Sequence, residues 1–317
     1  MHQPVLRQET VDLLGVRANG VYVDGTLGSG GHAEAVLERL GAGGVLYGID
    51  RDGEALERCG RRLGRFGGMF RPLRGNFAEM GSLLEAAGVD EVDGVVLDFG
   101  VSSEQLDTPG RGFSFMNDGP LDMRMDQRQG LTAAEVVNTY PEAALQAVLS
   151  GFGEERDSRR IARAVVKRRE VRPFAGTGDL AAVIWEVKGG RRGRQHPATK
   201  SFQALRMEVN GELDAVAQGL REALRILRIG GRMAAISFHS LEDRLVKQFF
   251  MEHEGRWISQ AAGGERWEGL LPAVRRVTRK PVQPAEAECA GNPRARSSKL
   301  RVAERVPAPV DNKERLR

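Results

Sequence analysis

The sequence is short of cysteine, of aromatic residues and of long apolar runs. Its 317 residues include two cysteines, Cys59 and Cys289, and aromatic side chains make up 6% of the chain. So few, so widely spaced cysteines suggest neither a disulfide framework nor a zinc site. No apolar run approaches the roughly 20 residues that cross a bilayer, and residues 1–9 lack the apolar core of a secretory signal. We therefore expect an unprocessed cytoplasmic protein without membrane contact.

Charge of one sign is also scarce. Lys and Arg number 47 against 43 Asp and Glu, which gives a formal net charge of +4. The 28% of charged residues, 41% of hydrophobic residues and 40 glycines are typical of a globular protein and exclude a disordered one. The slight basic excess, unevenly placed along the chain, weakly favours a polyanionic partner.

Apolar runs alternate with amphipathic segments over much of the chain. We predict strands at 20–24, 45–50, 69–73, 92–98 and 232–238, with helices at 32–40, 54–63 and 215–227 between them. Such alternation is typical of an α/β fold with a mostly parallel sheet. After a helix at 241–252, the segments 274–279 and 300–303 are candidates for the last two strands.

The pattern changes between about residues 103 and 195, where no strong strand is found. Helices are predicted there at 133–138, 142–149, 158–169 and 179–187. We interpret this stretch as a helical insertion after the fourth strand, and a set of long crossover helices is the alternative. The expected domains are residues 1–103 with 196–306 for the sheet and 104–195 for the insertion, and 307–317 form a polar tail.

A glycine-rich loop follows the first predicted strand. Asp24 ends this strand, and Gly28, Gly30, Gly31 and His32 follow before the next helix. Glycine allows backbone N–H groups to approach a ligand closely at such a strand-to-helix turn. Asp50 ends the next strand, where a carboxylate accepts hydrogen bonds from the hydroxyls of a ribose. Together they indicate a nucleoside cofactor, although a plain tight turn is the simpler alternative.

The identity of the nucleoside stays open at this point. Residues 28–33 also satisfy the loose dinucleotide pattern G-x-G-x-x-G/A, as in a nicotinamide-dependent oxidoreductase. Two features favour S-adenosylmethionine. Asp24 suits a positively charged amino acid group, and no second glycine-rich half follows.

The segment after the fourth strand carries candidate catalytic residues. Asp98, Phe99, Ser102 and Ser103 follow a strand tip, where open α/β sheets place their chemistry. If the group to be methylated is an exocyclic amino nitrogen of a base, it is a poor nucleophile. The site must then accept hydrogen bonds from its protons and aim the nitrogen at the methyl group. Asp98 is suited to this, and Phe99 is suited to stack on a base or cofactor. The alternative is that Asp98 only caps a turn.

Several chemistries are disfavoured by what surrounds these residues. Neither cysteine lies near a predicted strand tip, which argues against a covalent thiolate mechanism and leaves direct transfer to nitrogen or oxygen. His239, after the fifth predicted strand, either lines the base pocket or caps the next helix through Ser240. The histidines have no metal-ligand spacing, so we expect no catalytic metal.

At this level of detail the sequence resembles the small-subunit ribosomal RNA methyltransferase H family. The resemblance covers nearly the whole chain. It rests on the loop at 24–32 and on segments that include 2–6, 98–107, 111–115, 120–126, 196–198, 202–206, 209–213, 237–244 and 292–301.

The resemblance implies a class I, Rossmann-like methyltransferase fold with a helical insertion. It implies that S-adenosylmethionine methylates the N4 amino group of a cytosine in the decoding region of 16S ribosomal RNA, with S-adenosylhomocysteine as product. The substrate is then RNA, presented in the small ribosomal subunit, and a homodimer is left open. It also implies cofactor contacts at Gly30, Gly31, His32, Asp50, Phe77, Asp98 and Gln105.

Three basic clusters are candidate RNA contacts. They comprise Arg156 to Arg172, Lys188 to Lys200, and Arg294 to Arg301. Each cluster alone is more often a solvated face than a binding surface. If these clusters do bind RNA, a non-catalytic RNA-binding assembly factor is a third hypothesis, beside a methyltransferase and an oxidoreductase.

Overall fold

The computed structural model describes residues 4–190, 196–259 and 265–307. Within it the chain forms two compact units, the first comprising residues 1–100 and 214–317 and the second residues 101–213. The expected insertion, 104–195, is shorter than the second unit. The reason is α10 (Thr199–Asn210), which packs on α6 and α7 of that unit. His2, Gln3 and the tail beyond residue 307 lie outside the described residues.

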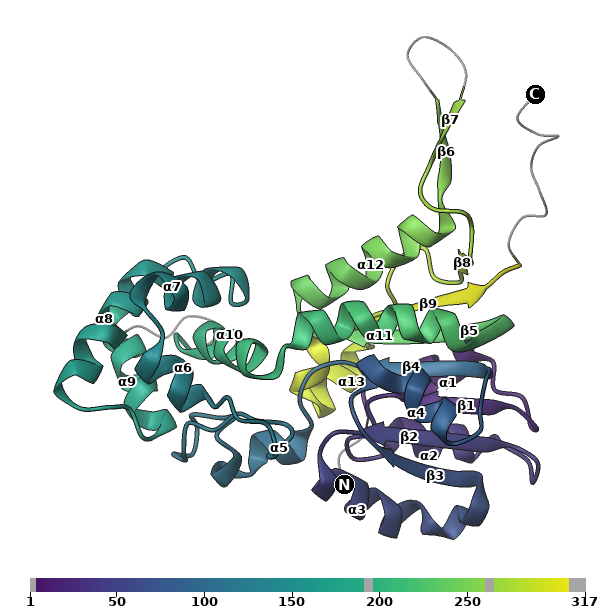
Figure 1. The fold of residues 1–317 in the computed structure, drawn as a ribbon, viewed down its shortest axis with the longest axis horizontal. Helices are drawn as coiled ribbons and strands as arrows, with labels where there is room; N and C mark the ends of the chain where they lie inside the picture. Colours follow the sequence, from purple (N-terminus) through teal and green to yellow (C-terminus); the bar gives the residue numbers. More distant parts are fainter. Residues whose placement is uncertain (1–3, 191–195, 260–264, 308–317) are drawn as a thin grey trace. The chain divides into compact units, whose positions relative to one another are not determined.

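The first unit is built around a seven-stranded sheet with the strand order β3-β2-β1-β4-β5-β9-β8 (Figure 1). Neighbouring strands from β3 to β5 run parallel, whereas β9 is antiparallel to both β5 and β8. The strands are β1 Val21–Asp24, β2 Val45–Asp50, β3 Phe70–Arg74, β4 Val92–Asp98, β5 Leu227–Ser237, β8 Val274–Arg276 and β9 Lys299–Arg305. The mostly parallel α/β sheet expected from the sequence is confirmed, including its last two strands.

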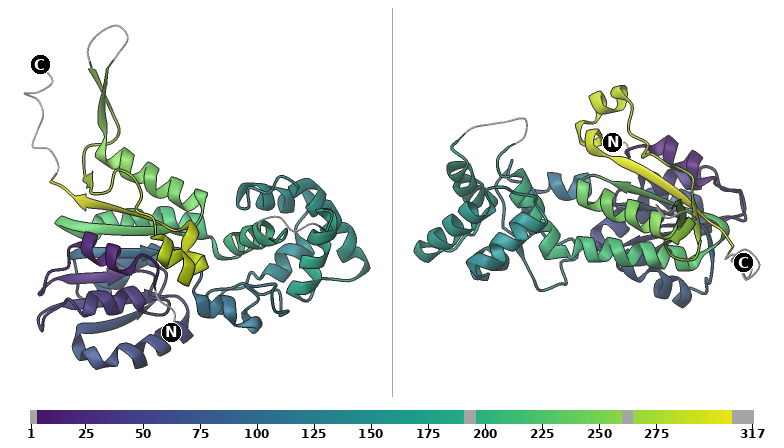
Figure 2. Two further views of the ribbon diagram at one scale, coloured as in Figure 1. Left: turned by 180° about the vertical axis from the view of Figure 1, so that it is seen from behind. Right: turned by 90° about the horizontal axis from the view of Figure 1, so that it is seen from above.

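Helices cover both faces of this sheet, as the two further views show (Figure 2). One hydrophobic cluster joins a sheet face to α1 (Arg7–Leu14), α2 (Gly31–Leu37) and α3 (Gly53–Leu63). A second cluster joins the other face to α4 (Met80–Ala86), α11 (Glu212–Ile226) and α12 (Ser240–Glu254). The central strands are buried from both sides, which explains their nearly continuous apolar sequences.

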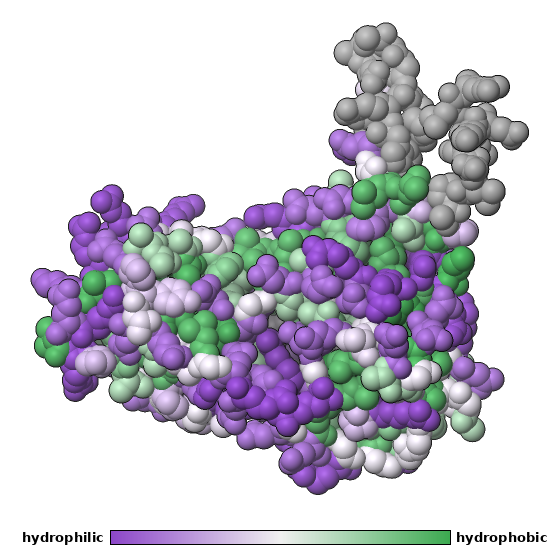
Figure 3. All heavy atoms as spheres, viewed as in Figure 1, coloured by the Kyte–Doolittle hydropathy of each residue, from purple (hydrophilic) through white to green (hydrophobic). Residues whose placement is uncertain are grey.

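The second unit is helical and has a hydrophobic core of its own. Its helices are α5 Ser103–Asp107, α6 Ala133–Thr139, α7 Glu142–Gly151, α8 Ser158–Val171, α9 Thr177–Val187 and α10. The core residues all lie between Val101 and Val209, and they include Met123 and Met125. Hydrophilic side chains gather over much of the surface seen in Figure 3.

Some element boundaries differ from those expected. β5 begins at Leu227 and not at residue 232, because Arg228–Gly231 form an irregularity opposite β4. Gly230, with φ +80°, permits this backbone path, and Arg228 pairs with Asp93. The sequence analysis did not predict α1, α4, α10, the short α13 (Glu286–Gly291) or the two-stranded hairpin of β6 (Arg256–Ser259) and β7 (Glu265–Glu268).

Candidate active site

The glycine-rich loop is tied to the carboxyl ends of the central strands. The backbone N–H of Gly25 donates to the carbonyl of Val96 at 2.9 Å, and that of Leu27 donates to Ile49 at 3.0 Å. The N–H of Gly28 donates to Oδ2 of Asp50 at 2.8 Å. These bonds hold the loop across the tips of β1, β2 and β4. The first two acids expected from the sequence, Asp24 and Asp50, are therefore brought to one edge of the sheet.

The loop glycines are required by neighbouring protein atoms as well as by backbone conformation. Gly30 has φ +77°, and a Cβ there would lie 3.0 Å from Sγ of Cys59. A Cβ on Gly31 would lie 2.8 Å from Cγ of Pro4. The sequence analysis attributed these glycines to the close approach of a ligand. In the structure, α3 and the N-terminal segment already lie against them.

Cys59 lies beneath this loop as a buried thiol. Its Sγ donates to the carbonyl of Gly28 at 3.2 Å. Burial, followed by the negative charges of Asp24 and Asp50, raises the pKa of Cys59 to about 12. The thiol is therefore protonated at neutral pH and is not a nucleophile.

Asp24 is a nearly inaccessible carboxyl group in an acidic surrounding. Its side chain is buried, and its Oδ1 accepts the N–H of Thr26 at 3.1 Å. Burial raises the pKa of Asp24 to about 6, with Asp98 and Asp50 adding to the rise and His32 opposing it. A cation bound nearby would relieve this unfavourable burial of charge.

His32 and Asp98 face each other from α2 and the end of β4. Nε2 of the buried His32 lies 3.5 Å from Oδ2 of Asp98. Burial alone would lower the pKa of His32, but the nearby carboxylate of Asp98 and the charge of Asp24 raise it. Oδ1 of Asp98 and Nδ1 of His32 are buried without a hydrogen-bond partner in the described part of the chain. Unsatisfied buried atoms of this kind are expected where a ligand binds.

Asp50 uses both carboxylate oxygens to organise the loop. Oδ2 accepts from Gly28, and Oδ1 accepts the N–H of Asp52 at 2.9 Å. Burial raises the pKa of Asp50, while these two backbone bonds lower it. A carboxylate oxygen has more than one lone pair, so the same group is still able to accept a ribose hydroxyl.

Two aromatic rings border the strand tips. Phe77, at the start of a short 3₁₀ turn, has its ring centroid 5.8 Å from that of Phe99. Phe77 also packs against α11, where a Cβ on Gly219 would lie 2.3 Å from its ring. Phe77, the ring that is expected beside the adenine, is therefore held in place by packing.

His239 is the N-cap of α12. Its Nδ1 accepts the N–H of Glu242 at 3.4 Å, and its Nε2 lies 3.0 Å from Oε1 of the buried Glu242. The sequence analysis assigned a cap to Ser240, which is instead the first residue of the helix. The N-cap lies one residue earlier because His239 has the extended backbone of a cap and its ring reaches the third helical residue.

The remaining expected residues lie in α5 of the second unit. Ser102 is the N-cap, and its Oγ accepts the N–H of Gln105 at 3.2 Å. Oε1 of Gln105 accepts the N–H of Ser102 at 3.1 Å, which completes a capping box. Ser103 follows as the first residue of the helix. Ser102 and Gln105 thus have a structural role that the sequence analysis did not foresee.

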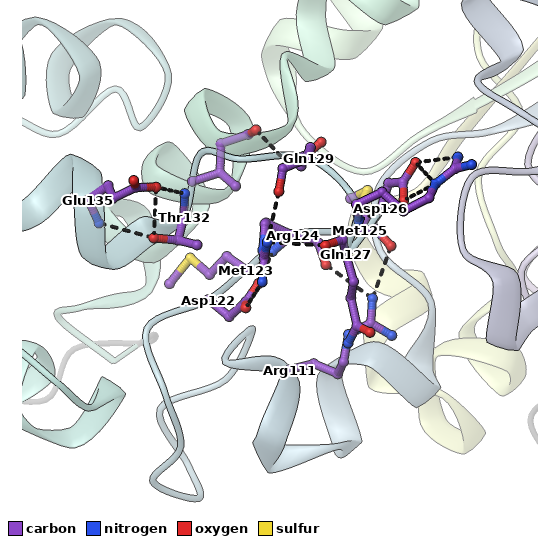
Figure 4. Close-up of polar contacts among 12 residues, drawn as sticks. Arg111, Asp122, Met123, Arg124, Met125, Asp126, Gln127, Gln129, Thr132 and Glu135 are labelled. Carbon is purple, nitrogen blue, oxygen red and sulfur yellow. Dashed lines mark hydrogen bonds and ion pairs between the residues drawn. The ribbon is translucent and has the colours of Figure 1, made fainter.

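The sequence analysis also missed a polar network within the second unit (Figure 4). Arg111 donates to the carbonyls of Arg124 and Met125 at 3.0 Å. The buried Asn210 donates to Met123 at 2.7 Å and accepts the N–H of Met125 at 2.8 Å. These bonds hold Met123 in a left-handed conformation with φ +60°. The signal for the network is spread over distant positions, so local patterns do not reveal it.

No group of side chains suited to a metal is found among the described residues. No described helix is long and apolar enough to cross a membrane.

Comparison with known proteins agrees with the geometry of the sheet edge. Residues 1–306 match the model of the MraW methylase family. The chain belongs to this family. It is 48% identical over 306 residues to Ribosomal RNA small subunit methyltransferase H of Carboxydothermus hydrogenoformans, covering 96% of this chain and 98% of that protein. The protein of the same name from Acidiphilium cryptum is 49% identical over 310 residues, with 97% and 98% covered.

Solved structures show a weaker likeness to this methylase. An rRNA methylase from Streptococcus thermophilus has a TM-score of 0.42 and 9% identity, with 97% of this chain and 99% of that chain covered. A SAM-dependent O-methyltransferase from Thermotoga maritima has a TM-score of 0.41 and 10% identity, with 98% and 69% covered. Both scores lie below 0.5, so the family assignment rests on the sequence match.

The sheet of this methylase has the class I methyltransferase fold. The methyl donor is S-adenosylmethionine. The residues at the sheet edge fit it, because a sulfonium and an ammonium group suit the buried carboxyl group of Asp24 and the buried Oδ1 of Asp98. Asp50, with lone pairs left on its carboxylate, is suited to accept a ribose hydroxyl.

Proposed function

We propose that this methylase methylates the N4 amino group of a cytosine in the decoding region of 16S ribosomal RNA, in the small ribosomal subunit. The relatives at 48% and 49% identity carry a name that specifies small-subunit ribosomal RNA. The observation that carries the chemistry is the unsatisfied buried Oδ1 of Asp98 at the tip of β4. A carboxylate there accepts a hydrogen bond from an amino group that approaches the methyl donor.

The proposed transfer is direct. Bound S-adenosylmethionine supplies an electrophilic methyl group on a sulfonium. The amino nitrogen forms the new N–C bond as the C–S bond breaks and its electron pair goes to sulfur. One amino proton then leaves to water. A covalent route would need a thiolate, and the pKa of Cys59, raised to about 12 by burial, opposes it.

We assign the remaining roles as follows. Asp24, Gly28, Gly30, Gly31, His32, Asp50 and Phe77 hold the cofactor, as does Gln105. Asp98 contacts both cofactor and base, and Ser102, Ser103 and His239 help to orient the base. RNA recognition falls to the helical part of the chain. Bases are best read when unstacked, so we expect the cytosine to be turned out of its strand.

The test uses tritiated S-adenosylmethionine with small ribosomal subunits that lack the modification, followed by nucleoside analysis. We expect label in N4-methylcytidine with the wild-type protein. Asp98→Asn, which keeps the side-chain shape but removes the charge, should lower the rate by about 100-fold or more. Asp50→Ala should raise the KM for the cofactor.

Glu57→Gln is the matched control, because Glu57 is an exposed acid on α3 that has no ion-pair partner among the described residues. Its rate should equal that of the wild type. Label in another nucleoside would refute the cytosine assignment. If wild-type protein that binds the cofactor labels no RNA, the RNA substrate is wrong.

A further inference from the structure

Residues 154–172, which include α8, hold the net positive charge of the chain. They contain eight basic and four acidic side chains, an excess of four that equals the net charge of the whole protein. The rest of the chain is therefore balanced. A concentrated excess of this kind is the electrostatic signature of a polyanion-binding surface.

Six of the eight basic residues of this segment, all of them on α8, divide into two groups by their contacts. One group is neutralised or fixed within the second unit. Arg160 pairs with Asp157 at 3.0 Å, Arg168 pairs with Asp179 at 2.8 Å, and Arg169 donates to the carbonyl of Val137 at 2.8 Å. Arg168 and Arg169 thus hold α8 against α9 and α6.

The other group forms one exposed row. Arg159, Arg163 and Lys167 are spaced four residues apart, so they lie on the same side of α8, opposite the buried Ile161 and Val165. Arg159 and Lys167 have no ion-pair or hydrogen-bond partner in the described part of the chain. Arg163 lies 3.6 Å from Glu142, a loose and exposed contact. We call these three residues the α8 row.

Several basic residues of the other two clusters are paired with acidic side chains. Lys299 and Arg301 both pair with Asp243, at 3.0 and 2.7 Å. Lys188 pairs with the buried Glu155 at 2.7 Å, and Arg191, Arg192 and Arg194 lie outside the described residues.

We infer that the α8 row binds consecutive phosphates of the RNA backbone and so positions the substrate RNA. This inference rests on the proposed function. The row spans about 12 Å from Arg159 to Lys167 at 1.5 Å per helical residue. Its three cations contact phosphates without reading bases, so they add affinity but no sequence preference.

The experiment measures the affinity of the full-length protein for a transcript of small-subunit ribosomal RNA at several salt concentrations. The variant is Arg159→Gln with Lys167→Gln, and the charge-matched control is Arg61→Gln with Lys247→Gln. Arg61 and Lys247 are exposed, unpaired in the described residues and located on α3 and α12. We expect the α8 variant to lose about tenfold in affinity and about 1.5 from the slope of log K against log salt.

Two further measurements make the test decisive. Arg159→Lys with Lys167→Arg, which keeps both charges, should retain the wild-type slope. The α8 variant should show a raised KM for RNA with an unchanged kcat. Equal affinity and slope for the α8 variant and its control would overturn the inference, even where the wild type methylates RNA. Failure of the wild type to label RNA would instead remove the proposed function.

Discussion

At the scale of single residues, the acidic edge of the sheet lowers the stability of the protein without its cofactor. Asp24 has a folded-state pKa of about 6, above the ordinary value of 3.8. The folded state therefore binds more protons than the unfolded state between these pH values, and the free energy of unfolding falls as pH rises through that window. A shift of this size corresponds to about 2 to 3 kcal/mol at neutral pH.

We therefore predict that Asp24→Asn stabilises the protein without cofactor at pH 7 by about 1 to 3 kcal/mol. The same change should weaken binding of S-adenosylmethionine and of S-adenosylhomocysteine, because both carry the positively charged amino group that Asp24 is expected to hold. Denaturant unfolding between pH 4 and 7 and calorimetric titration measure the two effects. Parallel pH profiles for wild type and variant would contradict the role given to Asp24.

The residues of the site were partly accessible from sequence. Asp24, Asp50 and Asp98 each end a strand, and parallel strands bring their carboxyl ends to one edge. The facing of His32 and Asp98, at 3.5 Å, depends on the direction in which α2 leaves the loop. The contact of Cys59 with the loop depends on the packing of α3. Local sequence patterns do not determine either of these tertiary features.

At the scale of elements, the network around residues 111–129 fixes a long loop without regular structure. Asn210 supplies three of its bonds, to Met123 and Met125 and to the carbonyl of Arg206 at 2.9 Å. A buried backbone group that loses its partner costs about 1 to 3 kcal/mol. The side chain of Asn210 thus supplies hydrogen-bond partners to the backbone of this loop, as a neighbouring strand does in a sheet.

We predict that Asn210→Ala destabilises the second unit by about 2 to 4 kcal/mol, because it leaves buried groups of Met123 and Met125 unpaired. Hydrogen exchange should show faster opening of residues 120–130. Asn117→Ala is the control, since Asn117 is exposed in the same loop region. If both variants exchange alike, the network does not stabilise the loop.

The sequence predicted the elements with strong periodicity and missed those that depend on context. The buried strands β2 and β4 were located to the residue, since their apolar runs end abruptly in acids. α10 was missed because its apolar positions serve the core of the second unit and were assigned to the sheet domain. The hairpin of β6 and β7 is short and has no neighbouring strand to enforce an alternating pattern.

At the scale of the whole molecule, the chain has separate cores. Every residue of the cluster formed by α6 to α10 belongs to the second unit, whereas the two clusters on the sheet belong to the first. Units with separate cores are able to open separately. The cofactor residues on the strand tips, Asp24, Asp50 and Asp98, are all in the first unit.

We predict that the cofactor protects the two units unequally. A ligand at 100 times its Kd stabilises the state that binds it by about 2.7 kcal/mol. With saturating S-adenosylmethionine, the amides of β1, β2 and β4 should exchange about 100-fold more slowly where exchange requires opening of the sheet. The amides of α7, α8 and α9 should change much less, because their core holds none of the cofactor residues of the strand tips. Mass spectrometry of exchanged peptides measures both sets in one sample. An equal gain in both units would mean that they unfold as one cooperative body, so the cofactor would stabilise the RNA-binding helices as much as its own site.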